Sequence, residues 1–190
     1  MEQLFIEDTT YKGQDFKEVP LKKGEYENCQ FHNCDFSGTD LSSMKFINCK
    51  FVSCNLSLVT STKTVFQEAH FKDCKLLGFR FDTCNAFGLS FLFENCSLNH
   101  SSFFGTKIKK TVFKHSQLQE TDFTQCDLTS ALFDHCNLLR AQFAQSILEK
   151  ADFRTAYNYS IDPASNRMKK AKFSLQGIVG LLDKYDIDIE

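Results

Sequence analysis

The chain has 190 residues, enough for one ordinary domain, with 42% hydrophobic residues and a formal net charge of -2. That charge argues against general binding to nucleic acid or to anionic membranes, and no apolar run reaches the roughly 20 residues that span a bilayer. The composition is unusual in its 21 Phe, 9 Cys, 2 Pro and no Trp. The N-terminus has acidic residues where a secretion signal is basic, so we expect a cytoplasmic protein with reduced thiols.

The first segment, residues 1–28, shows a repeat only near its end. Phe16, Leu21 and Tyr26 are five residues apart, a spacing that fits neither the helix period of 3.6 nor the strand period of 2. We predict that this segment forms an irregular N-terminal coil or cap.

Residues 29–156 keep the period of five throughout, with Phe or Leu at the centre of nearly every unit. The phase shifts once by two residues, near residues 87–92, and then holds from Phe93 to Phe153. Such regularity is an internal repeat, and it outranks any local propensity. We therefore predict a solenoid of stacked repeats.

All nine cysteines lie two residues before the centre of a unit, where other units have Ala, Ser or Thr. A position restricted to small residues is expected to point into a crowded interior, where free Cys behaves as a small hydrophobe. The spacing along one column would accept a disulfide, but the inward direction and a reducing cytoplasm argue against it. The inward small residues of this column are Cys34, Cys54, Cys74, Cys96 and Cys136.

The units Ala131–His135, Cys136–Arg140 and Ala151–Thr155 consist of a small residue, a variable residue, Leu or Phe, and two further residues. This pattern resembles the pentapeptide-repeat family. The resemblance implies an all-β fold, a right-handed quadrilateral β-helix in which five residues form one face and four faces form a coil of about twenty residues.

The implied coil can be tested in the sequence, because residues one coil apart should stack in columns at the usual strand spacing of ~4.8 Å. One column is Phe throughout, and the next is mainly Leu. The predicted core is Phe31, Phe51, Phe71, Phe93, Phe113, Phe133, Phe153 and Phe173, with Leu98, Leu118 and Leu138.

The chain ends with residues 157–173, predicted as a loop and the last coil, and residues 174–190, predicted as a short helix and tail. Ser174 is a suitable N-cap, and alternation near the C-terminus predicts a short edge strand. These elements would cap the last coil or, as the resemblance favours, form the seam of a homodimer. The seam residues are Ile178, Val179, Leu181, Leu182, Ile187 and Ile189.

No catalytic motif is present, whether GxSxG, a glycine-rich phosphate loop, HExxH or CxxC. His115 and His135 are expected to stack on an outer edge, but Zn²⁺ takes three or four ligands, and the side chain of Asp134 is expected on a different row. The sequence predicts a protein that is not an enzyme, without cofactor or metal, whose narrow interior has no room for a pocket.

The stretch Phe31–Leu41 is similar to the quinolone-resistance (Qnr) and related gyrase-binding members of the family. This resemblance implies a rod that mimics the shape of DNA, occupies the DNA-binding saddle of DNA gyrase or topoisomerase IV, and protects against quinolones. A charge mimic needs an acidic stripe. Residues 93–155 instead hold seven acidic and seven basic residues.

The alternative is a protein-binding scaffold whose partner is unknown and unrelated to topoisomerase. Leu92, Val112 and Leu132 precede the central Phe in three consecutive coils and are expected to face outward. Contiguous exposed apolar surface often marks a partner site. The strip is either such a site or the place where the apolar N-terminal residues, Leu4–Ile6, pack.

Overall fold

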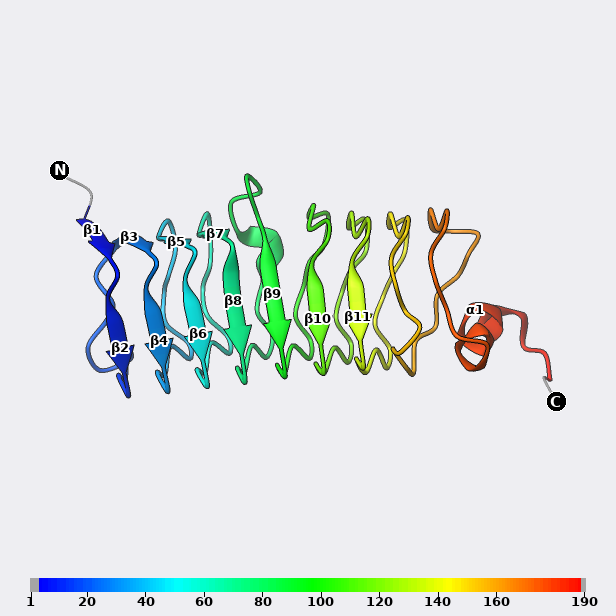
Figure 1. The fold of residues 1–190 in the computed structure, drawn as a ribbon, viewed down its shortest axis with the longest axis horizontal. Helices are drawn as coiled ribbons and strands as arrows, with labels where there is room; N and C mark the ends of the chain where they lie inside the picture. Colours follow the sequence, from blue (N-terminus) through cyan, green and yellow to red (C-terminus); the bar gives the residue numbers. More distant parts are fainter. Residues whose placement is uncertain (1–3, 189–190) are drawn as a thin grey trace.

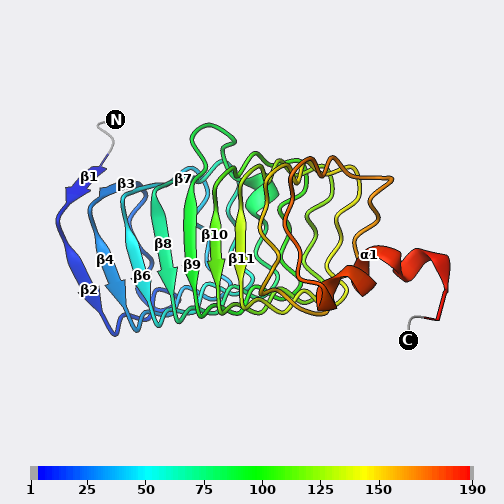
Figure 2. The same ribbon diagram turned by 45° about the vertical axis from the view of Figure 1, so that its right-hand side comes forward.

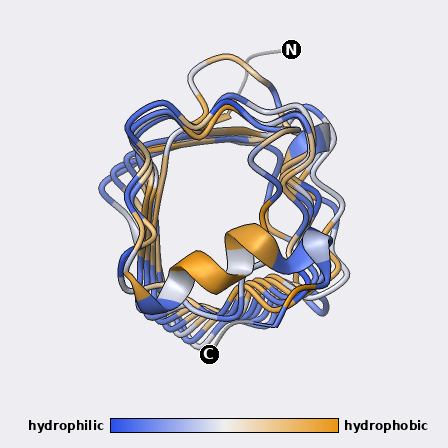
Figure 3. Ribbon diagram, turned by 90° about the vertical axis from the view of Figure 1, so that its right-hand side faces the viewer, coloured by the Kyte–Doolittle hydropathy of each residue, from blue (hydrophilic) through white to orange (hydrophobic). Residues whose placement is uncertain are grey.

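Short strands recur at the same place in successive coils, and each pairs in parallel with the strands of the coils before and after it (Figure 1). The computed structural model describes residues 4–188. Seen along its axis the solenoid has four sides (Figure 3). The predicted class, an all-β parallel β-helix with a short C-terminal helix, is confirmed.

Within residues 4–188, two of the four faces carry β-sheets, whereas the other two have only isolated bridges between coils. We call face 1 the one with the seven-stranded sheet, in the order β11-β10-β9-β8-β6-β4-β2, and number the others in chain order. Face 4 has the four-stranded sheet β1-β3-β5-β7. Faces 2 and 3 are joined by isolated bridges. The strands of face 1 are β2 (Thr10–Lys12), β4 (Gln30–His32), β6 (Lys50–Val52), β8 (Ala69–Lys72), β9 (Phe91–Glu94), β10 (Val112–Lys114) and β11 (Leu132–Asp134), and those of face 4 are β1 (Leu4–Glu7), β3 (Gly24–Glu27), β5 (Lys45–Ile47) and β7 (Val65–Gln67).

The N-terminal segment already follows the register of the coils. Ile6 pairs with Tyr26, and Tyr11 pairs with Phe31, as Phe31 pairs with Phe51 in the next coil. The irregularity expected for the first 28 residues is therefore confined, within the described residues, to the turn and extended segment at 16–23.

The two extra residues of the repeat form a loop. Ala69 pairs with Phe91, two positions beyond the usual spacing, whereas Phe93 again pairs with Phe113 at the usual one. The length is taken up by a 3₁₀ turn, η1 (Phe81–Thr83), and by residues 84–90, which protrude from the solenoid (Figures 1 and 2). Register is thus kept on both sides of the loop.

The interior of face 1 is a continuous stack of aromatic rings that begins at Tyr11 and ends at Phe173. Successive ring centroids are 4.6–5.3 Å apart with interplanar angles of 13° or less. The rings from Phe31 to Phe153 are fully buried, as are Leu98, Leu118 and Leu138 of face 2, and Phe173 is half-buried under the C-terminal segment. Full burial of one such side chain contributes about 1.5–3 kcal/mol.

A second stack of rings changes face along the chain. Before the loop, Tyr26, Phe46 and Phe66 stack on face 4. From Phe81 onward, Phe81, Phe103, Phe123 and Phe143 stack on face 3, opposite face 1. The two halves of the solenoid therefore fill their interiors differently.

Most corners of the coils adopt the left-handed backbone conformation, two residues after the centre of a unit. Asn33 has φ 53° and Lys110 has φ 59°. Their amide groups donate to carbonyls of the next coil, Asn33 to Val52 at 2.9 Å and Lys110 to Thr129 at 2.9 Å. These ladder bonds hold the unfavourable conformation in place, whatever the side chain.

The C-terminal end is covered by a helical segment, made of η2 (Gln176–Ile178), α1 (Val179–Leu182) and η3 (Asp183–Tyr185), which crosses the last coil (Figure 3). Ser174 Oγ accepts the amide N–H of Gly177 at 3.0 Å, as predicted for an N-cap. The carbonyl of Gly180 accepts the N–H of Ile161 at 2.8 Å, and a Cβ there would clash with the carbonyl oxygen of Tyr159. Glycine is required for this close approach.

The predicted edge strand near the C-terminus is wrong. Residues 186–188 form no strand, and Ile189 lies outside the described residues. Asp186 adopts φ 49° and turns the chain after η3, where its N–H bonds back to Asp183. An alternating pattern of Ile and Asp does not form a strand by itself, because a strand needs a neighbouring strand with which to pair.

Candidate functional site

The strip of Leu92, Val112 and Leu132 runs across β9, β10 and β11 on face 1. Val112 is in register with both Leu92 and Leu132, so the three side chains lie side by side on the outer surface. All three are half-buried. In the same row His70 precedes the strip and Asp152 follows it, so polar residues border it at both ends.

Leu4–Ile6 do not cover this strip, and that alternative is wrong. β1 pairs with β3 at the N-terminal end of face 4, whereas the strip lies on face 1 in the second half (Figure 1). Leu4 and Phe5 are 37% and 53% exposed, and Ile6 packs against the core. The register of β1 places this segment in a coil of its own.

The protruding loop presents an aromatic ring to solvent. Phe87 is 81% exposed, its N–H is bonded to Asn85 Oδ1 at 2.9 Å, and Gly88 follows with φ 74°. Buried Cys84 and Leu89 anchor the two ends of the loop. Phe87 is not among the residues singled out from the sequence. The signal that could have identified it is an aromatic residue where the period of five is interrupted, followed directly by a glycine.

The acidic side chains are mostly engaged in turns and ion pairs. Asp40 accepts the N–H of Ser42 at 2.8 Å and binds Lys23, and these contacts lower its pKa to about 2. In the second half, Asp152 binds Arg154, the largest cause of its lowered pKa, and Asp127 binds Lys109 at 3.2 Å. The carboxylates therefore serve corner geometry and do not form a free acidic stripe.

The nine cysteines are all reduced and buried. Within the predicted inward column, Sγ of Cys54, Cys74, Cys96 and Cys136 each donates to a carbonyl of the preceding coil at 3.2–3.3 Å. Burial raises the pKa of Cys136 to about 12. Thiols that are buried and protonated are poor nucleophiles and poor metal ligands.

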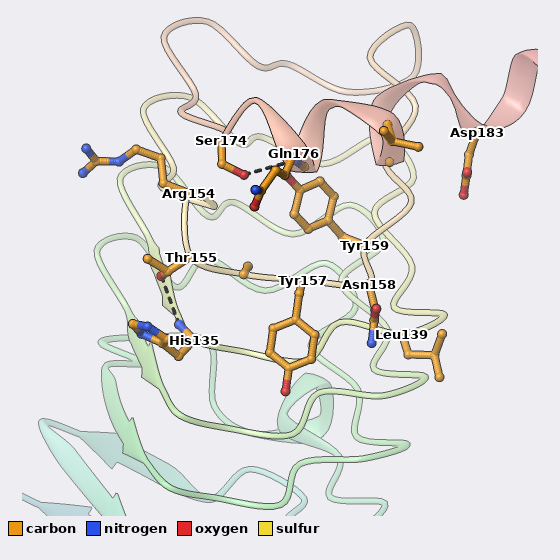
Figure 4. A pocket seen from close by; sticks show the side chains of 14 residues that line it. His135, Leu139, Arg154, Thr155, Tyr157, Asn158, Tyr159, Ser174, Gln176 and Asp183 are labelled. Atoms are coloured by element: carbon orange, nitrogen blue, oxygen red, sulfur yellow. Dashed lines mark hydrogen bonds between the residues drawn. The ribbon is translucent and has the colours of Figure 1, made fainter. Parts of the chain in front are cut away.

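A groove of about 580 Å³ lies between the last coils and the C-terminal segment (Figure 4). His135, Arg154, Tyr157 and Asp183 are among its lining residues. The prediction that the architecture has nowhere to hold a pocket is therefore wrong in part. The interior is filled with side chains, but the non-repetitive C-terminal segment leaves open space where it meets the corners.

The structure brings His115, Asp134 and His135 together. The two imidazole rings are stacked with centroids 5.0 Å apart, and Asp134 Oδ1 lies 2.8 Å from His135 Nδ1. The expectation that Asp134 points along a different row is wrong, because the left-handed backbone of His135, with φ 51°, brings its side chain beside that of Asp134. Potential ligand atoms of all three lie within 4.8 Å of one another.

The predicted seam residues lie on the helical segment and the tail. Ile178, Val179 and Ile187 are 41%, 47% and 55% exposed. Leu181 packs against the core, and Leu182 is half-buried. The segment thus packs on the last coil through Leu181 and leaves other apolar side chains exposed. Among residues 4–188, no helix is both long and apolar enough to cross a lipid bilayer.

Comparison with known proteins agrees with this architecture. The family described as pentapeptide repeats matches the chain in eight copies, over residues 27–60 and 121–157. The fold is similar to that of full-length QnrB1, a plasmid-mediated fluoroquinolone resistance protein, with 16% identity, a TM-score of 0.55, and 96% of this chain and 100% of that chain covered. HetL from the cyanobacterium Nostoc, a pentapeptide repeat protein involved in heterocyst differentiation regulation, is 16% identical with a TM-score of 0.38, covering 90% and 85%. No curated protein matches the sequence.

Proposed function

Because this chain is a pentapeptide-repeat protein, we propose that it is a non-enzymatic, rod-shaped scaffold that binds another protein. The observation that carries the proposal is the uncovered apolar strip of Leu92, Val112 and Leu132 on a rigid face. With neighbouring strands ~4.8 Å apart, the strip is roughly 10 Å long. Half-buried aliphatic side chains fixed in a sheet lose little entropy on binding, which favours association.

The more specific proposal is that the partner is DNA gyrase or topoisomerase IV and that the rod acts as a DNA-shape mimic that protects against quinolones. The similarity of the fold to QnrB1, a fluoroquinolone resistance protein, supports this choice. The carboxylates are engaged in turns and ion pairs, so recognition would rest on shape and apolar contacts instead of charge. Phe87 on the loop is the natural anchor, because exposed aromatics often dominate interfaces.

A second part of the proposal is a homodimer joined through the C-terminal segment. Its support is the exposure of three apolar residues on and just after that segment, Ile178, Val179 and Ile187. A partner copy would remove this surface from water. We also propose a cytoplasmic location, because nine reduced and buried thiols suit a reducing compartment.

The test of the gyrase proposal uses purified gyrase and topoisomerase IV, in supercoiling or decatenation assays and in quinolone-induced cleavage assays. We expect the protein to inhibit the reaction and to lower drug-stabilised cleavage, and we expect Phe87→Ala to weaken both effects. Absence of any effect on both enzymes would exclude the topoisomerase proposal and leave the scaffold proposal standing.

The test of the scaffold proposal changes Leu92, Val112 and Leu132 together to Asp. The matched control, Lys50→Asp with His70→Asp, changes charge in the same row outside the strip. Each variant is compared with the wild-type chain in a pull-down. We expect the triple variant to lose the partner protein that the wild type retains and the control variant to keep it, with the circular dichroism spectra of both variants unchanged. A partner retained by the folded triple variant would contradict the proposal.

The dimer is tested by sedimentation of the full chain. Ile178→Asp with Val179→Asp should give monomer, whereas Leu58→Asp, a change of an equally apolar residue that is 68% exposed on a corner far from the seam, should not. A wild-type monomer at all accessible concentrations would exclude the seam.

A further inference from the structure

Two imidazoles and one carboxylate converge at a corner of face 1 in the second half of the solenoid. We propose that His115, Asp134 and His135 bind a divalent late transition metal ion, with Zn²⁺, Ni²⁺ and Cu²⁺ as the class of ligand. Imidazole nitrogen favours these ions, whereas Mg²⁺ and Ca²⁺ prefer sites built from oxygen alone. Two nitrogens and one oxygen make three protein ligands, the number found in sites that keep one position open.

The repeat places the two imidazoles in suitable positions. His115 and His135 are the same corner residue of consecutive coils, with φ 50° and 51°, so their side chains leave the backbone in the same direction. The ligand atoms of the three residues lie within 4.8 Å of one another. Metal–nitrogen bonds of about 2.0–2.1 Å in a tetrahedral site need ligand atoms roughly 3.3 Å apart. Both His side chains are exposed, so small side-chain rotations can close this difference.

The third ligand is held by a residue of the next coil. Thr155 Oγ1 donates to Asp134 Oδ1 at 3.0 Å. The same hydroxyl oxygen accepts the amide N–H of His135 at 3.0 Å (Figure 4). One hydroxyl therefore fixes the carboxylate and the backbone of one imidazole together. Outer hydrogen bonds of this kind orient ligands and typically change metal affinity about 10- to 100-fold.

Two cationic side chains lie near the cluster, and they differ in their effect. Arg154 forms an ion pair with Asp152, at 2.7 Å, which offsets its charge. Lys114 is exposed and stands in register with Asp134 on the neighbouring strand. Its charge opposes a bound cation. Lys114→Gln should therefore tighten metal binding without touching a ligand.

The chain contains a matched control on another corner. His100 Nδ1 lies 3.3 Å from Glu120 Oε2, and both side chains are about half exposed. This pair has one imidazole and one carboxylate but no second stacked imidazole. It offers an exposed imidazole beside a carboxylate with one ligand fewer, and Glu120 is also paired with Arg140 at 3.6 Å. It therefore measures adventitious binding by a single exposed histidine.

The variants are expected to fold, because glutamine already occupies equivalent corners at Gln125 and Gln145, with φ 59° and 57°. Untagged full-length protein is titrated with ZnCl₂ and NiCl₂ by calorimetry, and with CoCl₂ while the visible spectrum is recorded. We expect one bound ion per chain, loss of affinity of at least about tenfold in His115→Gln and in His135→Gln, and an unchanged affinity in His100→Gln.

Two further measurements complete the test. Thr155→Val should weaken binding while keeping all three ligands, and MgCl₂ should give no heat of binding. Absence of saturable Zn²⁺ and Ni²⁺ binding would overturn the proposal. So would full affinity in folded His135→Gln, or an equal loss in His100→Gln, because either result would place the ion elsewhere.

Discussion

The half of the solenoid before the protruding loop and the half after it enclose interiors of the same outline but fill them differently. Before the loop, rings occupy the adjacent faces 4 and 1, as with Phe46 and Phe51, whose planes meet at 68°. After it, rings occupy the opposite faces 3 and 1, as with Phe113 and Phe123, whose planes meet at 80°. Both arrangements give edge contacts between stacks, a geometry that aromatic pairs prefer.

The exchange of faces is matched by the small inward positions. In the coil just before the loop, the centre on face 3 is the small Ser61 and the residue two positions earlier is the larger Val59, both buried, whereas one coil earlier the centre is buried Leu41. On face 3 after the loop, the centre is Phe123 and the earlier residue is Thr121. Tight packing tolerates redistributed volume better than added volume. The interior is therefore specified coil by coil and not by one invariant unit.

The junction between the halves has its own packing. Phe79 and Phe81 have ring centroids 4.3 Å apart, and Phe91 lies 5.0 Å from Phe81 and 6.0 Å from Phe66. Phe91 thus takes the space beside Phe66 that a face 4 ring of the next coil would fill. The ring of Phe91 is therefore an additional ring at the point where the aromatic stacks change from the adjacent faces 4 and 1 to the opposite faces 3 and 1.

Alkaline pH should produce the largest effect and separate the halves. Burial raises the pKa of Cys49 and of Cys136 to about 12, whereas an unfolded thiol ionises near pH 8.5. The folded state then holds protons that the unfolded state releases, so the free energy of unfolding falls as pH rises from about 9 to 12. Six of the nine cysteines precede Phe91, so the first half should lose more stability and unfold at a lower pH than the second. Alkylation of exposed thiols followed by mass spectrometry should therefore label cysteines of the first half at lower pH. Simultaneous labelling of both halves would contradict this.

Phe81→Ala should have the next largest effect, because it removes a ring that contacts both halves. Replacing a buried Phe by Ala costs about 3–5 kcal/mol, and urea unfolding should show that loss. Two separate transitions are expected if Phe81 couples the halves. Phe87→Ala is the control, with a change within about 0.5 kcal/mol because its ring is exposed.

Ser61→Phe tests whether the first half can adopt the arrangement of the second. We expect destabilisation of about 1–3 kcal/mol by thermal or urea unfolding, because the ring adds volume to a filled interior. Ser61→Ala removes the hydrogen bonds of Ser61 Oγ with the Arg80 carbonyl, at 2.8 Å, and with Thr83 Oγ1, at 3.1 Å, without adding volume, and should cost about 1 kcal/mol. Equal costs for the two variants would mean that packing on face 3 is not restrictive.

Lys110→Asn should have the smallest effect, and it should stabilise. Corners of the first half often carry Asn, as at Asn28, Asn33 and Asn48, whereas Lys110 and Lys150 occupy corners of the second. Asn tolerates the left-handed conformation better than Lys, so we expect a gain of about 0.5 kcal/mol in urea unfolding. Asn33→Lys should lose a similar amount, and a loss in both variants would exclude this explanation.

Much of the fold was predictable because the repeat is written directly in the sequence. The period of five and the columns one coil apart locate the Phe stack from Phe31 to Phe173 and the inward cysteines, since burial selects residue type strongly at those positions. The two-residue phase shift likewise predicts an irregularity near residues 87–92, and the protruding loop lies at residues 84–90. The exchange of the second stack from face 4 to face 3 is visible in the same columns once they are aligned.

The candidate sites were less predictable, because they depend on side-chain direction at corners and on non-repetitive segments. Nothing in the order of Asp134 and His135 indicates that the corner backbone brings them together. The glycines of the C-terminal helical segment weaken its helix signal, yet Gly180 is what permits contact with Tyr159. Leu4–Ile6 join the register of the coils as part of strand β1, which a run of three apolar residues is too short to reveal.

The coil that carries the protruding loop also has a consequence for how such a protein can diversify. Register on face 1 is normal from Phe31 to Phe71 and from Phe93 to Phe153, and the additional length stays outside the stack. A change of loop length or composition at residues 86–88, between the buried anchors Cys84 and Leu89, therefore leaves the pairing of the other coils intact. This makes the position a natural graft point, where new recognition surface can be inserted, by selection or by design, without rebuilding the rod.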